Sequence, residues 1–341
     1  MDSRERVREI LGKGRPDRTG FWLGHPHHEA MRGYEAAFGV NGRFELAGKV
    51  GDDLCQVSGD GAWKHPEGKP MFTLVNKGSG ESHSPWHLFA GCEEASDVDR
   101  YVWPDPSNLD LAALDAGIRK VEEAGMAVFS GMWSMFFHTV ADFFGMEGYF
   151  IKMHESPDAV HAVTRKVVDF YLSCNEAIYK EFAPRIDSYF LGNDFGTQLC
   201  SLIGPKEFDE FLLPYICELT GQAKRYGLFV TLHSCGSIYN LLPSIMRAGI
   251  DALNPIQALA ADMDAVTLKE GYGDRLSFMG GIDTQQLLPY GTPEEVYAET
   301  VRVRDTLAPF AILSPSHEVL LPNVSAANVR AMVKAATGRD I

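Results

Sequence analysis

Short apolar segments alternate with longer amphipathic segments along most of this chain. The apolar runs predict buried strands at 128–130, 188–191, 229–233, 250–254, 276–280 and 311–314. Several of these runs are apolar at successive positions, which is typical of parallel strands buried on both faces. Two further strands are predicted in the N-terminal part of the chain, at 21–23 and 50–56.

The segments between these strands have helical periodicity. Apolar residues recur every three or four positions in 157–182 and again in 205–226. Pro205 stands at the start of the second segment and Gly227 just past its end, where helices favour these two residue types. Eight strands separated by helices predict an α/β fold, a single (β/α)8 barrel of the TIM type over residues 1–341 with an N-terminal extension. No glycine-rich phosphate loop follows the first strand, which argues against an open dinucleotide-binding sheet.

Residues 57–106 do not follow the alternation. They are rich in Gly, His, Trp and Pro, and we expect them to form an inserted loop and hairpin region over the C-terminal mouth of the barrel. A prior of about 150 residues per domain would suggest two domains. One enlarged barrel with this insertion accounts for the length equally well.

Charge and cysteine content narrow the functional class. The chain has 31 Lys and Arg against 46 Asp and Glu, a net charge of −15. Binding to nucleic acid or to anionic membranes needs clustered basic residues, so neither is expected. Six cysteines are too few for a disulfide scaffold at this length. The charged N-terminus has no secretory pattern, and His138 and Asp142 interrupt the most apolar segment, so we expect a cytoplasmic protein.

Polar and metal-ligating residue types follow several of the predicted strands. In a (β/α)8 barrel, chemistry takes place at the C-terminal ends of the strands. Such residues are costly to bury unless they meet in a polar cavity. They are His233 and Cys235, Asn193 and Asp194, His317 and Glu318, and Gln257.

The His233-Ser-Cys235 segment is a candidate metal site. Residues two apart on an extended segment point to the same side, and imidazole nitrogen with thiolate sulfur is a common partial zinc shell. His317 and Asp194 are the best-placed further ligands. The alternative interpretation is that Cys235 is a small buried apolar residue and His233 a hydrogen-bonded polar one.

The other candidates each have a structural alternative. Asp53, with Asp52, would end the 50–56 strand and act as a general acid or metal ligand, or else cap a helix. Met132 and Trp133 form either core or an adaptable wall for a large flat ligand. His87 either lines the site or packs within its loop.

Several motifs carry a family resemblance. They are Tyr101-Val-Trp-Pro-Asp-Pro, Gly204-Pro-Lys-Glu-Phe-Asp-Glu-Phe-Leu-Leu-Pro-Tyr, His233-Ser-Cys235-Gly, Gly291-Thr-Pro-Glu-Glu-Val and Asn328-Val-Arg-Ala-Met-Val. Together they resemble the uroporphyrinogen decarboxylase superfamily, from about residue 16 to the C-terminus. The resemblance implies a (β/α)8 barrel, in agreement with the strand count.

True uroporphyrinogen decarboxylases bind an octacarboxylate through an arginine-rich N-terminal motif of the type RQAGRY. The corresponding stretch here, 21–34, keeps one arginine, Arg32. Asp53 (or Asp52) resembles the key aspartate of these enzymes, and His317 resembles their C-terminal histidine. Loss of the arginine cluster from an acidic protein argues against so anionic a tetrapyrrole.

The chain is closer to the corrinoid-dependent methyltransferases, whose zinc site is H-x-C with a distant cysteine. His233 and Cys235 match its first two ligands, but 314–317 has no cysteine. Either His317 substitutes as the third ligand, or metal binding is weaker or absent. The resemblance implies that Zn²⁺ acts as a Lewis acid in methyl transfer between a small methylated substrate and a corrinoid. Asp194, with Asn193, would orient the leaving atom or manage its proton, beside a pocket lined by Trp133, Met132, Gln257 and His87.

The chain has no D-x-H-x-x-G cobalt-liganding motif, so a corrinoid would come from a separate corrinoid protein. Family members are often homodimers. Two alternatives remain open at this point. One is metal-free decarboxylation of a porphyrinogen or another carboxylate-bearing pyrrole, with Asp53 stabilising the protonated ring. The other is a non-catalytic protein that binds a corrinoid or a metal.

Overall fold

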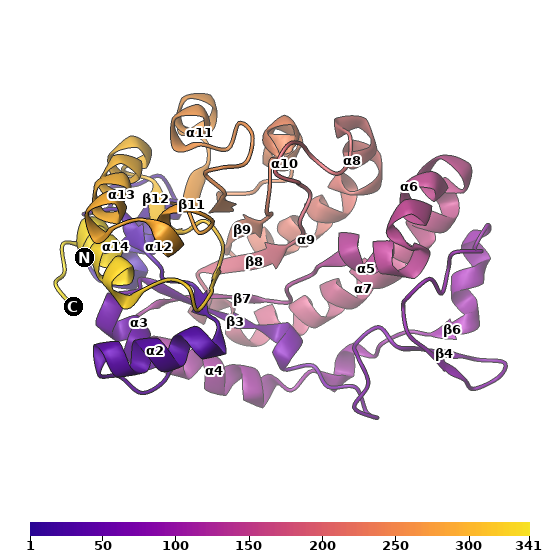
Figure 1. Ribbon diagram of the computed structural model, residues 1–341. Coiled ribbons are helices and arrows are strands. Elements are labelled where there is room, and N and C mark those ends of the chain that lie inside the picture. The colour runs from indigo at the N-terminus through magenta and orange to yellow at the C-terminus, as the bar shows by residue number, and fades with distance from the viewer.

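Eight parallel strands form one curled sheet in the computed structural model, which describes residues 1–341 (Figure 1). Their order across the sheet is β1-β12-β11-β10-β9-β8-β7-β3. The strands are β1 (Gly20–Phe21), β3 (Leu54–Ser58), β7 (Ala127–Gly131), β8 (Ser188–Gly192), β9 (Phe229–His233), β10 (Ala252–Ile256), β11 (Ser277–Ile282) and β12 (Ala311–Pro315). After β3, each strand of this sheet lies beside the one that precedes it in the sequence, which is the winding of a (β/α)8 barrel.

Two aspartates join the outer strands of this sheet. The backbone N–H of Asp53 donates to the carbonyl of Phe21 over 2.8 Å, and the Asp53 carboxylate accepts the Phe21 N–H, also over 2.8 Å. The Asp52 carboxylate accepts the N–H of Leu23 over 2.7 Å. Between β1 and β3, carboxylate oxygens therefore accept backbone N–H groups that carbonyl oxygens accept elsewhere in the sheet. This contact between the two outer strands, the β1–β3 seam, closes the barrel.

Helices surround the sheet, as Figure 1 shows for the series from α4 to α14. The helices are α1 (Ser3–Leu11), α2 (His28–Phe38), α3 (Arg43–Val50), α4 (Leu111–Glu123), α5 (Phe136–Phe144), α6 (Met146–Glu155), α7 (Pro157–Phe182), α8 (Pro205–Phe211), α9 (Leu213–Arg225), α10 (Leu242–Arg247), α11 (Ala265–Tyr272), α12 (Leu287–Tyr290), α13 (Pro293–Leu307) and α14 (Ala326–Thr337). None of them combines the length and the apolar content that a membrane-spanning helix needs.

The apolar pattern located most elements to within two residues. Strand β9 and helix α7 have the predicted bounds, whereas β10 begins two residues later than predicted. The predicted strand 50–56 was wrong at its start, because Val50 ends α3 and the left-handed Gly51 (φ 79°) terminates that helix. The predicted helix 205–226 is two helices, because Pro214 cannot donate the backbone hydrogen bond that a continuous helix requires.

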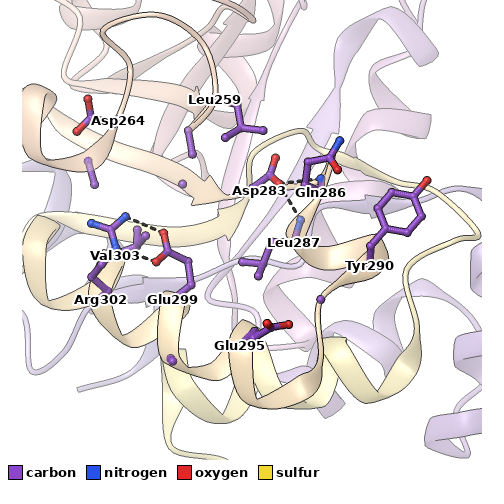
Figure 2. Close-up of a pocket in the computed structure, with 15 residues that line it drawn as sticks. Leu259, Asp264, Asp283, Gln286, Leu287, Tyr290, Glu295, Glu299, Arg302 and Val303 are labelled. Carbon is purple, nitrogen blue, oxygen red and sulfur yellow. Dashed lines mark hydrogen bonds and ion pairs between the residues drawn. The ribbon is translucent and has the colours of Figure 1, made fainter.

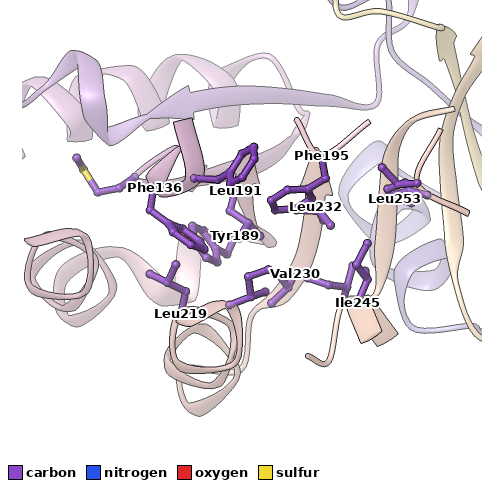
Figure 3. Packing of buried hydrophobic residues seen from close by; sticks show 14 of the residues in the cluster. Phe136, Tyr189, Leu191, Phe195, Leu219, Val230, Leu232, Ile245 and Leu253 are labelled. Atoms are coloured by element: carbon purple, nitrogen blue, oxygen red, sulfur yellow. The ribbon is translucent and has the colours of Figure 1, made fainter. Parts of the chain in front are cut away.

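Two apolar clusters hold the fold together. The larger one lies between the outer faces of the strands and the helices; Figure 3 shows part of it, with Tyr189, Leu191, Val230 and Leu232 of β8 and β9 among the labelled residues. The smaller one fills the barrel interior and includes Val7, Ile10 and Leu11 of α1 together with side chains from six strands. Helix α1 therefore covers the N-terminal end of the barrel.

The region 57–106 forms a small antiparallel sheet of β4 (Leu74–Asn76), β5 (Ser82–His83) and β6 (Tyr101–Val102), in the order β5-β4-β6. Its aromatic residues pack on α5, where Phe89 and Trp103 both contact Phe143. The insertion thus lies beside the helices that follow β7 (Figure 1). A last parallel pair, β2 (His25–Pro26) with β13 (Val319–Leu320), joins the loops after β1 and β12.

Candidate metal centre

His233, Cys235 and Asp194 come together where β8 and β9 end. The Nε2 atom of His233 lies 3.5 Å from the Cys235 Sγ and 3.4 Å from an Asp194 carboxylate oxygen. That oxygen also accepts the backbone N–H of Cys235 over 2.9 Å. The three ligand atoms lie within 4.8 Å of one another, so the structure brings together three of the residues that the sequence proposed.

Asn254, on the neighbouring strand β10, orients the His233 ring. The parallel register places Asn254 opposite His233, and its Oδ1 accepts a hydrogen bond from His233 Nδ1 over 2.8 Å. This contact turns Nε2 toward the thiol and the carboxylate. Metal-ligating histidines are commonly fixed by such a contact from the second ring nitrogen.

A second triad shares Cys235 and adds His317 and Glu318. Glu318 Oε2 is buried and has no hydrogen-bond partner, and it lies 3.7 Å from His233 Nδ1 and 3.8 Å from His317 Nδ1. The carbonyl of Glu318 accepts the N–H of His25, so the β2–β13 pair fixes this segment. The side chain of His317 is 42% exposed, and its Nδ1 accepts the Val319 N–H over 3.0 Å.

The ionisable groups of the cluster shift one another's pKa values. Burial opposes the charged form of His233, but its contacts with Asp194 and Cys235 and the charge of Glu318 raise its pKa above the ordinary value. Burial likewise opposes ionisation of Asp194, yet the contact with His233 lowers the pKa of that carboxyl. Burial raises the pKa of the Cys235 thiol. Nitrogen, sulfur and oxygen donors around an unpartnered buried carboxylate oxygen are a set that suits Zn²⁺.

Trp133 and one small cavity adjoin this cluster, and a second cavity shares a wall with the first. The Trp133 ring centroid lies 5.1 Å from that of His233. Trp133 and Glu318 border a cavity of about 440 Å³. A second cavity, of about 410 Å³, has three lining residues in common with the first, namely His25, Gln56 and Ser58. The mouth of the barrel therefore holds space for a small ligand beside the candidate metal ligands.

Asn193 and Gln257 support the cluster from behind. Asn193 is 1% exposed, and its amide bonds to the backbone of Phe137 and Ser134. Gln257 is 9% exposed, and its Oε1 accepts the N–H of Gly236 over 2.9 Å. Both residues hold the loops that carry the candidate ligands, so the structure gives them positioning roles.

Two other predicted pocket residues lie elsewhere. Met132 is fully buried in the apolar core, and its backbone N–H donates to Asn175. His87 contacts the Trp86 ring within the 57–106 insertion, and its own ring lies against Gly145. The core interpretation of Met132 and the loop-packing interpretation of His87 therefore describe their positions.

Asp53 lies at the opposite end of the barrel from this cluster. It precedes β3 and is fully buried, and its carboxylate contacts Arg6 over 2.7 Å and Arg18 over 2.9 Å. It also accepts the hydroxyl hydrogen of Ser3. Its partners saturate the carboxylate, and α1 covers it, so a role as the central acid of a substrate pocket does not fit this position.

A cleft of about 830 Å³ lies outside the barrel between α11, α12 and α13 (Figure 2). Its charged side chains already have partners, because Arg302 pairs with Glu299 and Asp283 accepts the N–H groups of Gln286 and Leu287. No histidine or cysteine lines it. The chemistry of the mouth therefore identifies the candidate site better than the size of this cleft does.

Comparison with known proteins agrees with the barrel fold. The uroporphyrinogen decarboxylase (URO-D) family matches residues 92–339. The chain belongs to this family. Among characterised relatives of this URO-D family chain are two methyltransferases of Methanosarcina mazei. A methylated-thiol–coenzyme M methyltransferase is 29% identical over 147 residues, covering 42% of this chain and 36% of the relative. The methylcobamide:CoM methyltransferase MtbA is 26% identical over 159 residues, covering 47% and 44%.

The matched region thus spans less than half the length of either relative. Among solved structures, a methyltransferase from Methanosarcina mazei superposes on this URO-D family chain with a TM-score of 0.66. The alignment has 15% sequence identity and covers 99% of both chains. At this level of identity the likeness concerns the fold alone, and it confirms the predicted (β/α)8 barrel.

Proposed function

We propose that this protein transfers a methyl group between a small methylated substrate and a corrinoid carried by a separate protein, with Zn²⁺ as the bound metal. The cluster of His233, Cys235, Asp194 and Glu318 at the barrel mouth carries the proposal, because its donors suit zinc and its position suits catalysis. The methyltransferase relatives support the same reaction class.

His233 and Cys235 would hold the metal, with a third ligand from the adjacent pair His317 and Glu318. The unpartnered, buried Oε2 of Glu318 favours the glutamate in this role, whereas His317 is more exposed and already accepts a backbone hydrogen bond. Catalytic zinc sites keep three protein ligands and one open position. Zinc bound there would supply Lewis acidity toward the sulfur or oxygen that carries the methyl group.

Asp194 would orient that atom or hold its proton. Its carboxylate lies 3.4 Å from His233 Nε2, and its side chain is 43% exposed at the mouth. Its backbone N–H donates to Nε2 of His138 over 3.2 Å, which fixes the turn after β8. Trp133 forms a wall beside His233 and limits the access of water to the reacting atoms.

Zinc analysis of the purified protein with methyl-transfer assays tests the proposal. We expect about one zinc per chain in the wild type, and its loss in His233→Ala and Cys235→Ser. Cys217→Ser, at an exposed cysteine on α9, is the matched control and should keep the metal. A metal-free wild type, or variants that retain a full zinc equivalent, would refute the site.

The assay would follow the visible spectrum of reduced cobalamin supplied with methylated thiols or methyl ethers. Formation of methylcobalamin that depends on Cys235 supports the proposal. Tight corrinoid or metal binding without turnover of any methylated compound would instead identify a non-catalytic binding protein.

A further inference from the structure

The turn that follows β11, residues 283–285, is held in one conformation by its own first side chain. Asp283 is 8% exposed. Its carboxylate accepts three backbone N–H groups, that of Gln285 over 3.0 Å and those of the next two residues over 2.8 Å each. A carboxylate that accepts N–H groups at the start of a helix stabilises the local backbone conformation, and here it closes the turn and begins α12.

One side of this turn holds the segment that carries His317 and Glu318. The backbone N–H of Ser316 donates to the Ile282 carbonyl over 2.7 Å, and the Thr284 N–H donates to the Ser316 hydroxyl oxygen over 3.1 Å. Ser316 is 4% exposed, so solvent has little access to either hydrogen bond. The position of Glu318, two residues further along the chain, therefore depends in part on the turn after β11.

The other side of the turn reaches the segment of Cys235 through a chain of three glutamine side chains. Gln285 Nε2 donates to Gln198 Oε1 over 3.4 Å, and Gln198 Nε2 donates to Gln257 Oε1 over 3.1 Å. The same Gln257 oxygen accepts the N–H of Gly236, the residue after Cys235. The turn after β11 is thus hydrogen-bonded, directly or through these amides, to both segments that supply candidate metal ligands.

We infer that Asp283 is a positioning residue of the candidate metal centre, because its carboxylate fixes the turn that joins the segments of Cys235 and Glu318. The inference rests on the proposed function and adds to it a residue that is not itself a ligand. Cys235 and Glu318 follow β9 and β12, which are not neighbours in the sheet, yet their ligand atoms lie within 4.8 Å of each other. If the turn between them loosened, the two ligands would move independently and would hold a metal less tightly.

Asp264 provides a matched control for Asp283. Its carboxylate accepts the backbone N–H groups of Val266 and Thr267 over 3.0 and 3.1 Å, where α11 begins. Both aspartates border the cleft outside the barrel (Figure 2). The hydrogen bonds of the Asp264 carboxylate stay within the first turn of α11. Asp264→Ala therefore removes a comparable cap without touching the segments of the candidate ligands.

Hydrogen exchange and cobalt binding together test the inference. In the metal-free protein, Asp283→Ala should speed exchange of the Ser316 and Gly236 amides by about fivefold, relative to the amides of α7. With Co²⁺ in place of zinc, Asp283→Ala should bind the metal about tenfold more weakly. Its thiolate-to-cobalt and d–d absorption bands, which report the ligand set, should shift. Asp283→Asn keeps an acceptor for the cap and should restore both results, whereas Asp264→Ala should match the wild type in both.

Each outcome of these measurements decides the role of Asp283. Wild-type exchange at both amides in Asp283→Ala, or an unchanged cobalt spectrum, would overturn the inference, and so would equal changes in Asp264→Ala. If Asp283→Ala fails to fold, Ser316→Ala removes only the hydroxyl that accepts the Thr284 N–H. This variant should speed exchange of the Thr284 amide and weaken cobalt binding, and wild-type values for both would count against the inference. A wild type that binds neither zinc nor cobalt would refute the proposed function, while the exchange rates would still show whether Asp283 fixes the two segments.

Discussion

His233 and Asn254 face each other across two neighbouring parallel strands, with Nδ1 of the histidine 2.8 Å from Oδ1 of the asparagine. This contact directs Nε2 toward Cys235. The strand register, rather than a flexible loop, therefore sets the orientation of the first candidate ligand.

Replacement of Asn254 by alanine is expected to weaken zinc binding by about 10- to 100-fold, the usual cost of losing the partner of a metal-bound histidine. Asn254→Asp keeps an acceptor at the same place and should bind zinc close to the wild-type level. Competition with a chromophoric chelator measures the affinity. Equal affinities for wild type and Asn254→Ala would show that the ring needs no such support.

Glu318 and His317 make different predictions for the third ligand. Glu318→Gln should lower the zinc affinity more than His317→Gln, because the buried Glu318 Oε2 has no hydrogen-bond partner whereas His317 is more exposed and its Nδ1 already accepts a backbone hydrogen bond. The same chelator titration compares the two variants. A larger loss in His317→Gln would assign the ligand to the histidine, as the family resemblance implies.

Asp53 is expected to matter for stability. Asp53→Ala would leave the buried Arg6 without one of its two carboxylate partners and open the β1–β3 seam. Breaking a buried ion pair costs about 3–5 kcal/mol, and urea unfolding measures the change. Asp305→Ala is the control, because the ion pair of Asp305 with Arg304 lies at the surface. This variant should lose less than about 1 kcal/mol of stability. If Asp53→Ala kept its stability but lost zinc-dependent activity, Asp53 would instead have a catalytic role.

Gly192, the last residue of β8, leaves room for the Trp133 ring. A Cβ atom at this position would lie 2.0 Å from two carbons of that ring, so Gly192→Ala must displace it. We expect a destabilisation of about 1–3 kcal/mol, typical of overpacking, with a change in tryptophan fluorescence. Gly148→Ala on α6, where the added Cβ meets nothing within 4 Å, should leave the fluorescence unchanged. An unaltered spectrum in Gly192→Ala would contradict the contact.

Lys13 is expected to make the stability of the protein depend on pH in the alkaline range. Burial, with the nearby Lys269, lowers the pKa of Lys13 from 10.5 to about 8. Between these values the unfolded chain holds more protons than the folded one, so stability rises with pH. Relative to Lys13→Met, the wild-type free energy of unfolding should rise by up to about 2 kcal/mol from pH 8 to 9.5. Solvent screening of the partly exposed side chain reduces this value. Parallel pH profiles for the two proteins would contradict the lowered pKa.

The apolar pattern was sufficient for the barrel because strands buried on both faces leave uniform apolar runs, and β9 and α7 have their predicted bounds. It failed at 50–56, where two aspartates next to an apolar stretch looked like a strand end. In the structure these residues follow the helix cap at Gly51 and precede β3. The polarity of a residue does not reveal whether it precedes a strand or follows one.

The site was predictable where chemistry and strand position agreed, as for His233, Cys235 and Asp194. Glu318 was named among the polar residues that follow the strands but was not singled out as a metal ligand, because the sequence does not show that the β2–β13 pair fixes it beside His233. The contact of Asn254 with His233 depends on strand register, which no single segment encodes.

Helix α1 covers the N-terminal end of the barrel, with Val7, Ile10 and Leu11 in its interior cluster and Arg4 and Arg8 paired with Asp187. The barrel therefore has a single entrance. Under the proposed function, a methylated substrate and a separate corrinoid protein would have to share that entrance, so the order in which they bind and leave would become part of the reaction. A corrinoid protein that bound first would trap the substrate in the barrel. A product that left slowly would block the binding of the corrinoid protein.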